Sequence, residues 1–215
     1  MLSIEREVRL SEATHDKGVL ILQGFLRNRF AHERPLSLVA SLAFEQSYGA
    51  IAGDSASLAE LCAILSRIGG FALRQDLAVT GSVNQQGEVQ AVGGLDEKIE
   101  GFFDCCRLRG LTGHQGVIIP AANVENLALR EDVGEAIERS EFQILPVRTV
   151  EQALEALTGI AAGAPDEPDT LFSLVDIALV GFAQRLAQFG ANRPDAGHSS
   201  EAGEAARSKA RLGGC

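Results

Sequence analysis

The sequence predicts a mixed fold of helices and strands. Apolar residues at helical spacing alternate along the chain with short apolar runs that are typical of strands. Gly-containing segments separate these stretches. The chain has 215 residues, 46% of them hydrophobic and 22% charged. A chain of this length supports one compact domain plus appendages.

The first part of the chain predicts one strand, one helix and a second strand. Charged and apolar residues alternate over 1–10, as in a half-buried strand. A strand that begins so early suggests a domain cut from a longer protein. Helical spacing predicts an amphipathic helix over 17–30, and alternation predicts a strand over 36–44. A loop is expected over 45–54.

The centre of the chain predicts a helix, a hairpin and a second helix. Asp54 can cap a helix over 55–68, which Gly69-Gly70 would end. Residues 76–92 are typical of a hairpin. After a bend at Gly93-Gly94, a helix is expected from residue 95 to about residue 109.

Two further strands and two capped helices are expected next. The strands are residues 116–120 and 142–147. Asn123 is expected to cap one helix, and Thr149 a second helix over 150–157. This order alternates strands with helices, as in a mixed fold.

The C-terminal part has a different composition. Residues 159–168 are rich in Ala, Gly, Pro and acids, which indicates a linker, and a helix fits 170–189. The last stretch, 190–215, has almost no large apolar residues, so disorder is expected. The predicted organisation is therefore a domain over 1–158, a linker and helix over 159–189, and a tail.

Charge and cysteines narrow the expected partners and location. The net charge of −10 repels the phosphate backbone of nucleic acids, so no nucleic-acid partner is expected. The four cysteines show no metal-ligand spacing, and we expect reduced thiols in a cytoplasmic protein, with Cys62 and either Cys105 or Cys106 in the core. No membrane span is expected, because no segment is expected to reach the roughly 18 to 20 apolar residues that are needed to cross a bilayer.

One candidate for chemistry is the run Gly53-Asp54-Ser55-Ala56-Ser57. It lies where a loop becomes a helix, which would expose the hydroxyl of Ser55 beside unpaired backbone N–H groups. Such donors can stabilise an oxyanion, and Gly53 permits close approach of a substrate. A simple helix cap made of small residues explains the same run.

Lys98 is the second candidate. It falls in the first turn of its helix, where cations are disfavoured. That position, with partial burial, would favour the neutral amine, and a neutral amine beside a serine hydroxyl is a nucleophile–base pair. A surface lysine paired with Asp96 or Glu97 is the ordinary alternative. No histidine lies within either candidate segment.

Six motifs in order resemble the proteolytic domain of Lon proteases, over roughly residues 1–158. They are Phe44-Glu45-Gln46-Ser47-Tyr48, Gly53 to Ser57, Ala78-Val79-Thr80-Gly81, Gly87-Glu88-Val89, Val92-Gly93-Gly94-Leu95-Asp96-Glu97-Lys98-Ile99, and Val117-Ile118-Ile119-Pro120 with Asn123. The GDSAS form resembles the Lon-B branch and bacterial Lon-like proteins.

The resemblance implies a serine-type endopeptidase with a Ser-Lys dyad. Ser55 matches the family's nucleophile and Lys98 its general base, which together form an acyl-enzyme. Thr80 matches a threonine whose hydroxyl helps to hold the lysine. Backbone N–H groups near Asp54 and Ser55, with Gly53 before them, would form the oxyanion hole.

The resemblance also implies an α+β fold and an assembly. The fold is the Lon proteolytic-domain fold, grouped with ribosomal-protein and GHMP-kinase domains, and the predicted elements are compatible with it. Family members form hexameric rings and are normally fused to an AAA+ ATPase that unfolds the substrate and feeds it to the protease. Unfolded or damaged proteins are the expected substrates. ATP and Mg are expected only in that ATPase part, and no cofactor or metal is expected in this domain.

Two departures from the family pattern are visible. Many relatives carry an acidic residue three positions before the nucleophile, where this chain has Ala52. No Walker A sequence occurs in the chain, so any ATPase would lie outside it.

Two other functions compete with proteolysis. A phosphotransferase of the related kinase fold could use the helix N-terminus at GDSAS to bind phosphate, but it would lack the longer Gly-rich loop and leave Lys98 unexplained. A non-catalytic assembly module would carry the dyad unaligned. The distance between Ser55 Oγ and Lys98 Nζ discriminates, because a working pair requires about 3 Å.

Overall fold

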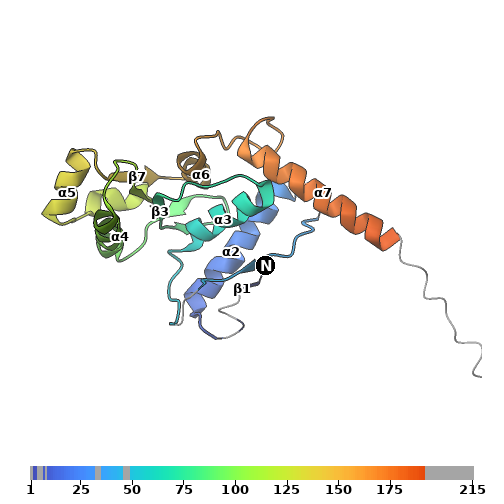
Figure 1. Ribbon diagram of the computed structural model, residues 1–215. Coiled ribbons are helices and arrows are strands. Elements are labelled where there is room, and N and C mark those ends of the chain that lie inside the picture. Colours follow the sequence, from blue (N-terminus) through green and yellow to red (C-terminus); the bar gives the residue numbers. More distant parts are fainter. Residues whose placement is uncertain (1, 4–6, 8, 32–34, 46–48, 192–215) are drawn as a thin grey trace, which may run out of the picture. The chain divides into compact units, whose positions relative to one another are not determined.

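The computed structural model describes residues 2–3, 7, 9–31, 35–45 and 49–191 (Figure 1). Residues 46–48 of the first motif and residues 192–215 of the expected tail lie outside the described residues. The chain divides into two compact units, Met1–Ala183 and Gln184–Cys215. The elements discussed below belong to the first unit, except for the last turns of the final helix.

A three-stranded parallel sheet forms the centre of the first unit. Its strand order is β3 (Leu77–Val79), β6 (Gly116–Pro120) and β7 (Gln143–Val147), with Ala78 opposite Val117 and Val117 opposite Ile144. Parallel neighbours need crossover connections, usually helical. Here these contain α4 (Leu95–Arg109) and α5 (Glu131–Glu138).

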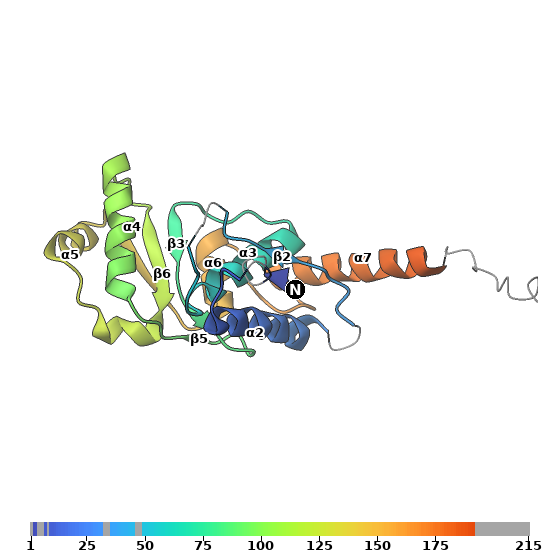
Figure 2. The same cartoon turned by 90° about the horizontal axis from the view of Figure 1, so that it is seen from below.

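The two faces of the sheet face two separate cores. Along β6, Val117 and Ile119 contact one core, while Ile118 contacts the other, as the period of two of a strand requires. The first core contains α4 and α5, and the second contains α2 (Ala13–Phe30), α3 (Ser57–Gly69) and α6 (Val150–Thr158). Figure 2 shows α4 and α6 on opposite sides of β6.

Two small sheets complete the strands, and both correct the sequence-based expectation. Strand β2 (Ser41–Leu42) pairs in parallel with β1 (Leu2–Ser3), and it is the only strand within 36–44 among the described residues. The hairpin is β4 (Ser82–Val83) with β5 (Val89–Gln90). The expected hairpin over 76–92 was therefore wrong in its first half, because β3 pairs with β6 instead.

The helix after β6 also differs from expectation. It is a 3-10 helix, η1 (Ala121–Asn126), and Pro120, not Asn123, stands at its N-cap. The Asn123 side chain bonds instead to the backbone of Val92. The other cap is confirmed, since the Thr149 side chain accepts from the backbone N–H of Gln152.

Helix α7 (Leu171–Ala191) differs from the expectation that no segment is long and apolar enough to span a membrane. Over Leu171–Phe189 it is long and apolar enough to cross a bilayer by length and composition. Core helices pass the same test, and the first half of α7 places buried side chains in the core with α2, α3 and α6: Leu171, Phe172, Val175 and Leu179. The expected burial of Cys62 and of one of the adjacent pair is confirmed, with Cys106 buried and Cys105 exposed.

Candidate active site

The turn that carries Ser55 lies immediately before α3. Gly53 has a φ of 74°, in the left-handed region that favours glycine, and Ser55 is half-buried two residues before the helix begins. The N-cap of α3 is Ala56, with no side-chain cap bond. The expected cap by Asp54 is therefore wrong, because its carboxylate accepts a hydrogen bond from Ser82 Oγ at 2.8 Å.

The segment Thr80-Gly81-Ser82 holds this turn from the side of the sheet. The backbone N–H of Gly81 donates to the Ser55 carbonyl at 2.8 Å, and the Thr80 hydroxyl donates to the same oxygen at 3.2 Å. In return, Leu58 N–H donates to the Gly81 carbonyl at 3.0 Å. Together with the bond from Ser82, these contacts set the position of Ser55 against the end of β3.

Lys98 reaches the serine from the first turn of α4. Its Nζ lies 2.8 Å from Ser55 Oγ, and it also donates to the Gly93 carbonyl at 3.4 Å. Gly94 precedes the helix with a φ of 63°, so the bend needs a residue that tolerates the left-handed region. The two candidate residues, 43 positions apart in sequence, are thus brought within hydrogen-bond distance.

A cavity of about 260 Å³ opens beside the pair. Small and β-branched side chains make most of its wall, and its lining residues are Ser55, Ala56, Ala78, Val79, Thr80, Lys98 and Val117. The backbone N–H groups of Asp54 and Ser55 donate to no backbone carbonyl within the described ranges. Of these two residues, Ser55 lines the cavity.

Two details differ from the sequence-based expectations. Lys98 is exposed and not partly buried. The hydroxyl of Thr80 lines the same cavity as Lys98, but the bond that it donates goes to the Ser55 carbonyl. Thr80 therefore supports the serine turn, and the Gly93 carbonyl is the acceptor beside the lysine.

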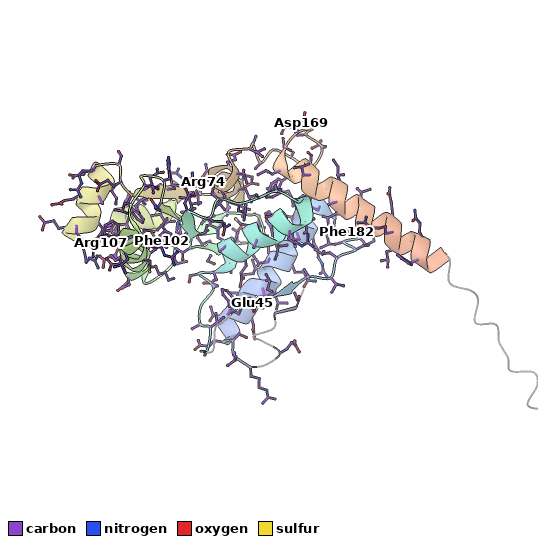
Figure 3. The ribbon with its side chains drawn as sticks, in the orientation of Figure 1. Glu45, Arg74, Phe102, Arg107, Asp169 and Phe182 are labelled. Carbon is purple, nitrogen blue, oxygen red and sulfur yellow. The ribbon has the colours of Figure 1, made fainter. Side chains whose placement is uncertain are left out.

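Helix α4 is anchored at its far end by a surface ion network. Arg130 bonds Asp104 at 2.8 Å, and Arg107, labelled in Figure 3, bonds Asp132 at 2.7 Å. The hydrogen bond from Arg130 holds the pKa of the Asp104 carboxyl below its usual range. This network attaches α4 to the start of α5 independently of the contacts at Lys98.

Three residues make bonds at the site that the sequence analysis did not predict. They are Ser82, Gly93 and Asn123, which bond respectively to Asp54, Lys98 and Val92. Within the part of the chain that the structure describes, no group of three or more His, Cys, Asp or Glu side chains could hold a metal ion.

Comparison with known proteins identifies a family and several relatives of this chain. The family model for the Lon protease (S16) C-terminal proteolytic domain matches residues 46–159. The chain is 48% identical over 157 residues to a protein of Escherichia coli K12 named "Putative Lon protease homolog", covering 73% of this chain and 27% of that protein.

Two further relatives have the same kind of name. A "Putative Lon protease homolog" of Haemophilus influenzae is 47% identical over 74% of this chain and 26% of its own length. An "Archaeal Lon protease" of Thermococcus kodakarensis is 38% identical over 63% of this chain and 19% of its own length. The chain thus spans about a quarter of the length of the bacterial relatives. Because the family model covers more than half of the chain, the chain belongs to the family of Lon protease C-terminal proteolytic domains.

Proposed function

We propose that this domain is a serine endopeptidase that hydrolyses peptide bonds of unfolded proteins through Ser55 and Lys98. The observation that carries the proposal is the 2.8 Å separation of Ser55 Oγ and Lys98 Nζ at the mouth of a cavity. A nucleophile and its base must lie within this distance before a proton can pass between them. Family membership supports the same reaction.

The reaction begins when neutral Lys98 accepts the proton of the Ser55 hydroxyl. Ser55 Oγ attacks the carbonyl carbon of the substrate and forms a tetrahedral intermediate. Backbone N–H groups near Asp54 and Ser55 would donate to its oxyanion. The Lys98 ammonium then protonates the leaving amine, and the acyl-enzyme remains.

Hydrolysis of the acyl-enzyme uses the same groups in reverse. Lys98 accepts a proton from water, the resulting hydroxide attacks the ester, and the proton returns to Ser55 Oγ as the acid product leaves. Thr80 and Gly81 keep the Ser55 carbonyl, and therefore the turn, in place throughout. No cofactor or metal enters these steps.

We also infer the setting of the domain from its family. The proposal includes an AAA+ ATPase part, which would use ATP and Mg, a hexameric ring and a cytoplasmic location. It also includes the ribosomal-protein and GHMP-kinase-like topology, with which the parallel sheet and its flanking helices are compatible. Damaged or unfolded proteins are the expected substrates.

The test uses labelled casein, which is already unfolded and needs no motor to unfold it. Wild-type protein should release fluorescent fragments, whereas Ser55→Ala and Lys98→Ala should not. The matched control is Lys17→Ala, which removes an exposed lysine of α2 and should keep full activity. Normal turnover by either dyad variant contradicts the proposal, and a wild-type protein without activity favours the non-catalytic module.

A further inference from the structure

The side chain of Asn123 makes two hydrogen bonds to a single residue across the site. Its Oδ1 accepts from the backbone N–H of Val92 at 3.0 Å, and its Nδ2 donates to the Val92 carbonyl at 2.9 Å. One amide thus satisfies both backbone groups of Val92, as a neighbouring strand would. Asn123 itself is half-buried in η1, directly after the central strand β6.

Val92 leads directly into the bend that presents Lys98. The next two residues are Gly93 and Gly94, which have more backbone freedom than any other residue type. The Gly93 carbonyl is the second acceptor of Lys98 Nζ, at 3.4 Å. The orientation of this carbonyl depends on the peptide units that Asn123 holds at Val92.

The direction of the lysine hydrogens matters for a base. A neutral primary amine has two N–H bonds and one lone pair, and only the lone pair can accept the Ser55 proton. A carbonyl can only accept, so the Gly93 oxygen engages one N–H of Lys98. With one N–H engaged there, the lone pair is left to face Ser55 Oγ, which lies 2.8 Å from Nζ.

We infer that Asn123 is a positioning residue, which holds Val92 so that the Gly93 carbonyl orients Lys98 toward Ser55. This inference rests on the proposed peptidase function. Asn123 does not touch the reacting atoms; it acts through Val92 and Gly93.

The rest of α4 has its own anchors, so the effect of Asn123 is confined to the bend. The carboxylate of Asp96 accepts from the backbone N–H of Ala128, and Glu100 accepts from that of Arg130. These bonds and the surface ion network do not involve Asn123. The helix should therefore stay in place when the Asn123 side chain is removed.

The kinetic test is Asn123→Ala, with Asn126→Ala as the matched control. Asn126 ends the same 3-10 helix and is exposed. A displacement of about 1 Å at a reacting group can lower turnover about 100-fold. We expect Asn123→Ala to lower kcat at least about tenfold with little change in KM, and Asn126→Ala to match wild type. Asn123→Asp, which keeps the acceptor for Val92 N–H, should fall between the two.

A second readout does not need peptidase activity. The chain has three lysines, at positions 17, 98 and 209, so carbon-13 labelling at Cε gives three NMR signals, and Lys98→Arg identifies the relevant one. In Asn123→Ala the Lys98 signal should move toward those of the other two lysines, which should not move. If Asn123→Ala does not fold, the same measurement is made on Asn123→Asp.

The outcomes separate the two proposals. A wild-type protein without activity contradicts the proposed function. A shift of the Lys98 signal in Asn123→Ala still supports the role of Asn123. An unshifted Lys98 signal overturns that role whatever the activity. In an active protein, a kcat within twofold of wild type, or a loss confined to KM, overturns it as well.

Discussion

Removal of the Ser82 hydroxyl tests how firmly the serine turn must be held. Ser82 is 4% exposed, and its Oγ donates at 2.8 Å to the Asp54 carboxylate, directly before Ser55. A hydrogen bond to a charged group contributes about 1.5–3 kcal/mol. If all of it held the turn, its loss would slow turnover about 10- to 150-fold, at tenfold for each ~1.36 kcal/mol.

The structure favours the lower end of that range. Two other bonds, from Gly81 N–H and from the Thr80 hydroxyl, hold the Ser55 carbonyl and survive in Ser82→Ala. We therefore expect kcat to fall about tenfold, and the free energy of unfolding to fall by about 1–2 kcal/mol. A double-mutant cycle with Asp54→Ala should give a coupling of about 1 kcal/mol or more.

The assay is casein hydrolysis beside urea unfolding, with Ser66→Ala as control. Ser66 Oγ donates to the Phe71 carbonyl near the far end of α3, so its removal costs a comparable bond away from the site. Ser66→Ala should lose stability and keep its kcat. Wild-type kcat in Ser82→Ala, or equal losses in both variants, would refute the reasoning.

Three further predictions follow from other contacts. Lys98→Arg should lower turnover about 10²–10⁴-fold in the casein assay, because a guanidinium stays protonated and cannot act as a base; retention of a tenth of the activity would contradict this. Phe142→Ala should cost about 3–5 kcal/mol in urea unfolding, since Phe142 is 1% exposed and meets Phe103 edge to face at 5.3 Å; a loss under about 1 kcal/mol would speak against that packing. Burial raises the pKa of the Cys62 thiol to about 12, so a thiol reagent at neutral pH should label exposed Cys105 and spare Cys62, and rapid labelling of Cys62 would count against its burial.

Local patterns were reliable where one short segment carries the whole signal. The helix Leu95–Arg109 was predicted at its observed bounds, and the strand Gly116–Pro120 likewise. Both have strong punctuation, with glycines before the helix and an uninterrupted apolar run in the strand. The Gly69-Gly70 stop is confirmed too, since Gly70 closes α3 in the left-handed region.

Patterns failed where the partner of a segment decides its structure. Leu77–Val79 is a strand as expected, but it pairs with β6 in parallel and not within a hairpin. Alternation over 36–44 predicted a longer strand than the two residues of β2, because a strand needs a neighbour for its backbone groups. In the same way, the sequence predicted that Asp54 caps α3, whereas in the structure its carboxylate accepts a hydrogen bond from Ser82.

By itself, the sequence determined the chemistry available to this chain: a serine at a loop-to-helix junction, a lysine in a first helical turn, and motifs in the order of a family that the comparisons confirm. Only the tertiary structure decided that Ser55 and Lys98 lie 2.8 Å apart, that Ser82 bonds to Asp54, and that Asn123 bonds to Val92. The physical reason is the separation in sequence over which each kind of interaction acts. Residue spacing reports the face that a short segment buries, whereas a hydrogen bond between residues far apart in sequence depends on how the sheet and its crossover helices bring them together.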